Sequence, residues 1–265
     1  NAVSAYLKSS GVNSGAGGLI GYLNVSNKVE IQGGENGYNV SAKVYSDSNS
    51  GVLIGNLEAN GKTYISNYSV GGSIKNESSK ESNGAGGFIG RVNNLATDVS
   101  GSAKGELFIY NEEGYANNVS STTVDANKKA GGIIGLISNT KAIISIGRDD
   151  EGAGSTIKLS QTVLSKAYAG GVIGSVAGNC DYTNLTIMNI EMIGHIDVEG
   201  GNNRIVIGGD SEKTAINVGS IVGNNTTETA GGVIGHLKAF AANELSFGTI
   251  TVGSKTAEKT LGTMT

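Results

Sequence analysis

One short pattern of residues recurs along the chain and limits what it can fold into. The pattern is Gly-Gly, an apolar residue, Ile, Gly, a variable residue and a second apolar residue, as in residues 17–23. Self-similarity at a roughly fixed period is typical of stacked structural units. We therefore predict one continuous repeat array over residues 1–265. Regular copies stand at 17–23, 86–92, 131–137, 170–176 and 231–237, and degenerate copies at 51–57 and 219–223.

The repeat has a period of about 35 residues, because the final glycines of six copies stand at positions 21, 55, 90, 135, 174 and 235. Each unit also contains an apolar, β-branched run after the motif and another before the next motif. Such runs, bounded by Gly, Asn, Ser and Asp, are typical of strands and turns. We therefore predict three short strands per unit. The runs are 29–31, 63–65, 106–110, 142–146, 185–188 and 245–252 after the motif, and 40–45, 70–74, 119–124, 157–163 and 215–218 before it.

A unit of three short strands cannot bury its own apolar face, so the units are expected to stack. Stacking places Ile on Ile and Gly on Gly along parallel sheets, and no window repeats apolar residues with a helical period. The predicted fold class is all-β, a parallel β-solenoid (β-helix) with insertions in its edge loops. We expect it to be right-handed, because parallel crossovers almost always are. The residues predicted to mark its rungs are Gly18, Ile20, Gly21, Ile54, Gly55, Gly87, Ile89, Gly90, Gly132, Ile134, Gly135, Gly171, Ile173, Gly174, Gly223, Gly232, Ile234 and Gly235.

The positions within the motif carry different predictions. The Ile and the apolar residue before it would point to opposite faces of a strand, so either both faces are covered or the following Gly bends the chain. The final Gly has two possible explanations. Either its backbone adopts a conformation that other residues rarely adopt, or a neighbouring backbone lies too close for a Cβ. The next residue varies, as in Tyr22, Arg91 and His236. We predict that this variable position faces solvent.

Composition excludes several classes of partner. The formal net charge of −4 and the 16% of charged residues provide no basic surface for nucleic acid. The apolar runs are well short of the roughly 20 residues that span a bilayer, so no membrane insertion is expected within this segment. Cys180 is the single cysteine, which excludes an intrachain disulfide.

Polar insertions interrupt the array and are the predicted binding elements. Loops emerge from the edge of a solenoid and can lengthen at little thermodynamic cost. Exposed loops on a rigid scaffold often carry the binding residues. The insertions are 33–39, 111–118, 149–155, 179–184 and 200–203.

No arrangement of residues predicts catalysis, so no catalytic residue is assigned. His195 and His236 are isolated in the sequence and lack the spacing of metal ligands. The one dense acidic group is Asp149, Asp150 and Glu151. These are candidate ligands of a calcium ion, which binds several carboxylate and carbonyl oxygens; the alternative is a solvated turn. No other cofactor is expected.

The same acidic loop supports an alternative function, a carbohydrate-active β-helix enzyme. Polysaccharide lyases with this architecture place acidic calcium ligands beside a Lys or Arg. Asp149 and Asp150, with Arg148 and Lys158, are the nearest approach to that set. The small aromatic content, 5%, disfavours stacking of sugars.

The chain begins within a repeat, because residues 3–10 resemble residues 40–47 and both lead into a copy of the motif. We therefore expect a segment of a longer surface protein, flanked by other segments of the same polypeptide. The ends of a solenoid are unpaired sheet edges that need a cap or a partner. Contact between copies end to end, as in a self-assembling extracellular fibre subunit, is a further hypothesis.

The Gly-Leu-x-Gly core with Ala-Gly-Gly ahead of it resembles the GLUG motif, a short repeat of large bacterial surface proteins. The copies that fit are 16–21, 85–90, 130–135, 169–174 and 230–235. GLUG repeats occur in adhesin-like proteins and beside the catalytic domain of some immunoglobulin A-cleaving peptidases. The resemblance implies an extracellular stalk or adhesive region on a bacterial cell surface, with a host or cell-surface glycan or protein as ligand. It supplies no catalytic residue, and the chain departs from it at Val52 and Ser220.

Overall fold

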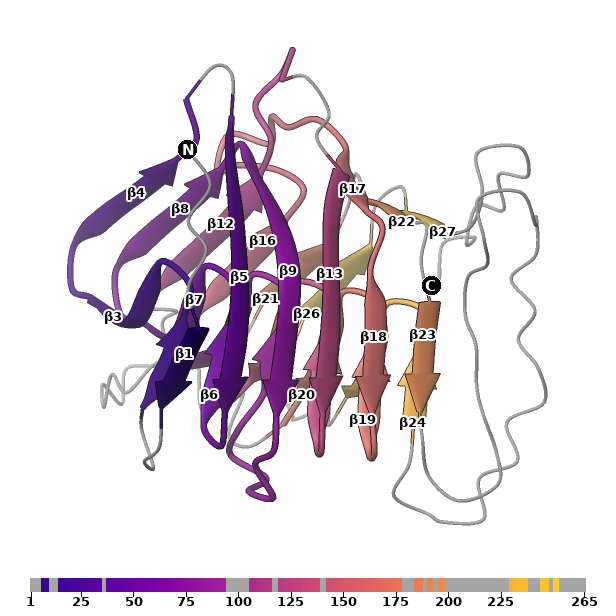
Figure 1. The fold of residues 1–265 in the computed structure, drawn as a ribbon. Coiled ribbons are helices and arrows are strands. Elements are labelled where there is room, and N and C mark those ends of the chain that lie inside the picture. Colours follow the sequence, from indigo (N-terminus) through magenta and orange to yellow (C-terminus); the bar gives the residue numbers. More distant parts are fainter. Residues whose placement is uncertain are drawn as a thin grey trace.

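Within the residues that the structure describes, the fold is an all-β parallel solenoid of six coils. The computed structural model describes residues 6–9, 14–34, 37–93, 105–115, 119–138, 142–177, 184–187, 190–192, 195–198, 229–237, 244–247 and 250–252. The strands within these ranges form four sheets whose ladders are all parallel, and each coil adds one rung to every sheet (Figure 1). Figure 1 shows the coils side by side, from the indigo N-terminal coil to the yellow C-terminal coil. The predicted fold class is confirmed; its handedness stays a prediction.

Sheet I contains the longest strands, two of which have nine residues. Its members are β1 (Tyr6–Ser9), β5 (Tyr38–Ser46), β9 (Tyr68–Asn76), β13 (Val119–Ala126), β17 (Ile157–Leu159), β18 (Thr162–Ser165), β22 (Ile190–Met192), β23 (His195–Val198) and β27 (Ile250–Val252). Sheet II is made of very short strands that carry the Ala-Gly part of the motif. Its members are β2 (Gly15–Gly17), β6 (Asn49–Gly51), β10 (Ala85–Gly86), β14 (Lys129–Gly131), β19 (Tyr168–Gly170) and β24 (Thr229–Gly231).

Sheet III begins at the Ile of each motif. Its members are β3 (Ile20–Val25), β7 (Ile54–Ala59), β11 (Ile89–Asn93), β15 (Ile134–Ile137), β20 (Ile173–Val176) and β25 (Ile234–Leu237). Sheet IV follows it in every coil. Its members are β4 (Lys28–Gln32), β8 (Lys62–Ser66), β12 (Glu106–Tyr110), β16 (Ile143–Ile146), β21 (Asn184–Ile187) and β26 (Glu244–Phe247). Coils 1 to 6 are the sets that start with β2, β6, β10, β14, β19 and β24.

Each coil has four sheet positions, so the prediction of three strands per unit is wrong. The motif is not one strand: a bend at the second Gly and the apolar residue separates sheet II from sheet III. In coil 4 the bend lies at Gly132 and Ile133, between β14 and β15. Thus the chain does bend, as one of the two explanations of the apolar pair required, but the bend comes before the Ile rather than at the following Gly.

The bends stack on one another through a repeated hydrogen-bond pattern. The backbone N–H groups of Ile133 and Ile134 both donate to the carbonyl of Val172 in the next coil, at 2.8 and 3.0 Å. The same double donation joins coil 3 to coil 4, where Ile133 is the acceptor. Each bend therefore satisfies its own backbone groups with the bend of the next coil, which meets the requirement that buried backbone groups be paired.

Close backbone approach explains the motif glycines. A Cβ on the final glycine Gly135 would lie 2.3 Å from the backbone nitrogen of Ala85 in the preceding coil. A Cβ on the first glycine Gly131 would lie 2.0 Å from the carbonyl oxygen of Ile134. Neither glycine has a positive φ. Of the two explanations offered by the sequence, the neighbouring backbone is therefore the one that applies.

The apolar pair of each motif fills the core. In coils 2 to 5 the Ile is fully buried, and the residue before it is at most 2% exposed. The ladder of sheet III places these residues in one column, with Ile54 beside Ile89 and Ile89 beside Ile134. The predicted stacking of Ile on Ile is confirmed.

The variable position of the motif is buried in the inner coils, so the prediction that it faces solvent is wrong. Asn56 and Ser175 have no exposed surface, and Arg91 is 6% exposed. The cause is the short distance between sheets II and III: a Cβ on Gly84 would lie 2.7 Å from Cβ of Leu136, the variable residue of coil 4. The position opens in the first and last coils, where Tyr22 is 46% exposed and His236 is partly exposed.

Some predicted strands differ from the observed ones, and some predicted features fall on residues outside the described ranges. The run 157–163 is divided at Ser160 and Gln161 into β17 and β18, and the run 245–252 is divided into β26 and β27. Val52 replaces the second Gly in coil 2, and its N–H donates to Gly87 instead of to the first Gly of the next coil. Gly223 and the insertions 179–184 and 200–203 fall wholly or mainly outside the described residues.

Candidate functional site

The insertion at 149–155 forms a folded loop rather than an open one. Gly147 and Gly152 have φ of 97° and 88°, angles that favour glycine. Asp149 Oδ1 accepts hydrogen bonds from the backbone of Glu151, at 3.0 Å, and of Ala153, at 2.8 Å. Such aspartate–backbone bonds are typical of turns. The loop therefore has a defined shape, and it starts from the end of β16.

The tip of the loop returns to the outer side of sheet IV. Asp150 accepts a hydrogen bond of 2.7 Å from the hydroxyl of Tyr64, which lies 86 residues earlier on β8. Lys62 Nζ lies 3.5 Å from the same carboxylate and 2.8 Å from Glu106 on β12. These contacts attach a loop of coil 4 to coil 2, and Lys62 links it further to Glu106 of coil 3.

The ionisable groups at the tip shift one another. Burial, followed by the hydrogen bond to Asp150, raises the pKa of Tyr64 to about 12. The bond from Tyr64 lowers the pKa of Asp150. The hydrogen bond with Glu106 raises the pKa of Lys62. At neutral pH the tyrosine and the lysine are therefore protonated, and the aspartate is ionised.

An aromatic stack lies beneath the loop. The rings of Tyr64 and Phe108 are 5.1 Å apart with an interplanar angle of 19°, and Tyr110 completes the cluster. Lys28 Nζ lies 5.1 Å from the centre of the Tyr64 ring. All three aromatic side chains are at most 9% exposed, although they point away from the main core cluster. The loop and the lysines thus cover an apolar stripe on the outside of sheet IV.

A groove of about 480 Å³ runs beside the loop. Its residues come from coils 2 to 5: Lys62, Glu106 and Phe108, then Ile143 and Ser145, then Thr186, with the loop residues 148–152 as one wall. We call it the sheet IV groove. Its lining has two cationic side chains and four carboxylates, a net charge of 2 − 4 = −2. A volume of this size is in the range of small-ligand sites.

The three calcium candidates all line this groove, and two of them serve other contacts. Asp149 Oδ1 holds the turn, Asp150 binds Tyr64 and Lys62, and Glu151 is exposed. Within the described ranges, no three His, Cys, Asp or Glu side chains are grouped so that they could hold one ion. Calcium binding therefore stays a prediction without a clustered ligand set. Arg148 also lines the groove, whereas Lys158 lies on β17 and does not.

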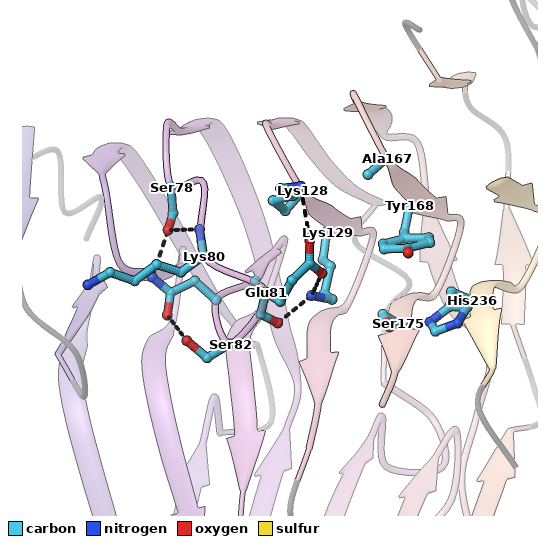
Figure 2. Close-up of polar contacts among 12 residues, drawn as sticks. Ser78, Lys80, Glu81, Ser82, Lys128, Lys129, Ala167, Tyr168, Ser175 and His236 are labelled. Carbon is cyan, nitrogen blue, oxygen red and sulfur yellow. Dashed lines mark hydrogen bonds and ion pairs between the residues drawn. The ribbon is translucent and has the colours of Figure 1, made fainter. Parts of the chain in front are cut away.

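A second polar cluster joins sheets II and III on another side of the solenoid (Figure 2). Glu81 lies in the loop 77–84 and forms ion pairs with Lys128, at 2.9 Å, and Lys129, at 2.7 Å; Lys129 also donates to the Glu81 carbonyl. Lys129 Nζ lies 5.7 Å from the centre of the Tyr168 ring, which stacks on His236 at 4.5 Å. Figure 2 shows these residues in one row across neighbouring coils. The cluster therefore ties coils 3 to 6 together.

The serine next to this second cluster is not an accessible nucleophile. Ser175 Oγ lies 3.0 Å from His236 Nδ1, a distance that would suit a nucleophile and a base. However, Ser175 has no exposed surface, so a substrate cannot reach its hydroxyl. The pair attaches coil 6 to coil 5.

The sequence interpretation missed the loop 77–84 and the pairing of His236. A signal for the loop was present: nine residues lie between the end of β9 and Gly86, whereas four lie between the end of β5 and Gly51. The partners of His236 had no local signal, because Tyr168 and Ser175 lie a full coil earlier in the sequence.

Replacing Tyr64 with phenylalanine is expected to remove one tyrosine that ionises near pH 12. In the wild type the folded state keeps the Tyr64 proton between pH 10 and 12, where the unfolded state has lost it, so the stability from this group falls as pH rises through that window. Loss of the hydrogen bond to Asp150 should also lower the free energy of unfolding of the variant by about 1 kcal/mol at neutral pH. Tyrosinate absorbance against pH and urea unfolding measure both. Tyr38→Phe, at a 47% exposed residue, is the control; equal titrations of the Tyr64 variant and the wild type would contradict this assignment.

Comparison with known proteins identifies no relative. No family model, curated protein sequence or solved structure matches the chain.

Proposed function

We propose that this chain is a non-catalytic structural and adhesive segment of a bacterial cell-surface or secreted protein, and that it binds ligand through inter-strand loops. The observation that carries the proposal is the sheet IV groove, which a loop between β16 and β17 builds on the flank of a rigid solenoid. The recurring motif residues are occupied by packing between coils. Binding therefore falls to the stretches between the motifs.

The extracellular location rests on the resemblance of the motif to the GLUG repeats of surface proteins. An array of stacked coils suits a stalk, because each coil contacts only its neighbours and the length grows with the number of repeats. Within the part of the chain that the structure describes, no helix has the length and hydropathy to cross a bilayer.

The alternative of a lyase-like enzyme has less support. A lyase needs an unprotonated base that removes a proton next to a carboxylate. The pKa of Tyr64, which binds the loop beside the groove, is raised to about 12, and the pKa of Lys62 in the lining is also raised, so both groups hold their protons at neutral pH. Asp150 is ionised, but its lowered pKa makes it a weak base.

Assembly into a fibre is a second candidate, in which coils of separate copies stack end to end. Leu19 and Tyr22 of the first described coil are more than 40% exposed, and such apolar side chains can pack against a further coil, either of the same polypeptide or of another copy.

Beads coated with the purified segment test the adhesive function. We expect them to adhere to surfaces that carry polysaccharides or glycoproteins, and we expect adherence to be lost when residues 149–153 are replaced by two glycines. In cells that make the protein, an antibody against the segment should label intact cells, and external protease should remove the label. Wild-type beads that adhere nowhere, or equal adherence of the two proteins, would overturn the proposal. Electron micrographs in which rods lengthen with concentration would favour the fibre.

A further inference from the structure

The geometry points to an amino-sugar oligosaccharide as the ligand of the sheet IV groove. This inference rests on the proposed function and deepens it, because it names the chemical class that the groove recognises. The first argument is shape. Residues of four successive coils line the groove, and neighbouring strands lie about 4.8 Å apart, so its floor extends for about 14 Å along the axis. An elongated trough of about 480 Å³ suits a short linear chain.

The second argument is charge. Four carboxylates outnumber two cationic side chains in the lining. Lys62, Glu106 and Asp150 are engaged with one another, and the remaining charged groups of the lining are Arg148, Asp149 and Glu151, in which the carboxylates again exceed the cations. A uronate polymer would therefore meet a net negative surface, whereas a ligand with ammonium groups would be attracted. Glu151, at the exposed end of the loop, is placed to meet such a group.

The third argument is the mixture of apolar and hydroxyl groups on the floor. Ile143 and Thr186 are partly exposed and supply apolar surface and a hydroxyl group to a sugar ring, whereas Phe108 and Ser145 lie beneath them at 5% and 3% exposed. Backbone recognition of a peptide is disfavoured, because β8, β12 and β16 each pair with a strand on both sides and have no free edge. The observations therefore favour a sugar chain over a basic peptide.

Titration calorimetry at pH 6 tests the inference with four probes: the tetramers of β-1,4-linked glucosamine, of its N-acetylated form and of galacturonic acid, and tetralysine. We expect the glucosamine tetramer to bind most tightly and to weaken as salt is added. Glu151→Gln should lower its affinity about two- to fivefold, as expected for an exposed ion pair. Thr186→Val should lower it about fivefold through a lost hydrogen bond.

Asp47→Asn is the matched control, because it removes one exposed carboxylate far from the groove, in the turn between β5 and β6; it should leave the affinity unchanged. Absence of binding by the glucosamine tetramer, tighter binding of the uronate, or tetralysine binding with the same response to Glu151→Gln would each overturn the inference. If one of these results is found while beads coated with the wild-type segment adhere and beads coated with the loop variant do not, the ligand class has failed but the adhesive function has not.

Discussion

Replacing Gly135 with alanine is expected to destabilise the solenoid by about 4 kcal/mol or more, enough to separate the array at its centre. The added Cβ would lie 2.3 Å from the nitrogen of Ala85 and 2.5 Å from its carbonyl carbon and oxygen. These atoms belong to the backbone of sheet II, so no side-chain rotation relieves the overlap. Coils 3 and 4 must move apart, and the hydrogen bonds from Phe88 and Ile89 to Ile133 are then lost.

The effect is expected to be visible as a change in cooperativity as well as in the urea midpoint. The stability of a stacked array is close to a sum of interfaces between neighbours, so one broken interface leaves two shorter arrays. Gly71→Ala is the matched control. Gly71 lies on β9 without a positive φ, and a Cβ there would find its nearest atom at 3.5 Å. This change should be neutral or stabilising by about 0.4–1 kcal/mol. Equal midpoints for the Gly135 variant and the wild type would refute the close-packing explanation.

The architecture could be predicted from the sequence because the repeat fixes the register. Once units of about 35 residues stack, each Ile of the motif lies beside the next one, as Ile54 does beside Ile89. The fourth strand could not be predicted in the same way. The bend between sheets II and III occurs at Gly132 in coil 4 and at Val52 in coil 2, so no single residue type marks it in the sequence.

The candidate site was predicted only in part. The acidic loop was placed correctly between two strands, and its residues do line a groove. Its partner Tyr64 could not be foreseen, because the loop turns back over two coils and the contact spans 86 residues.

The variable position of the motif was expected at the surface because its residues are polar or of mixed size. Sheet II lies close to it, and Asn56 and Arg91 are buried.

Removing the carboxylate of Glu81 is the second change with a large expected effect. Lys129 is 2% exposed, and Glu81 supplies both its carboxylate and its backbone carbonyl. Burial lowers the pKa of Lys129, and the bond to Glu81 offsets that only in part. Glu81→Ala therefore leaves a buried ammonium group without its counter-charge. We expect the free energy of unfolding to fall by about 2–3 kcal/mol at neutral pH. This is less than the usual cost of breaking a buried ion pair, because the Glu81 side chain is itself 62% exposed.

The pH dependence of this loss has a definite sign. Since the folded state lowers the pKa of Lys129 below the ordinary 10.5, the unfolded state binds more protons between the two values, and stability rises with pH in that window. The penalty of Glu81→Ala should therefore be largest at neutral pH and shrink as pH approaches 10.5. Urea unfolding of Glu81→Ala, Lys129→Met and the double variant measures the coupling. Lys129→Met should rescue the Glu81 variant, whereas Lys128→Met, at a more exposed partner, should not. If the double variant loses as much stability as Glu81→Ala alone, Glu81 acts through the loop 77–84 and not through the buried charge.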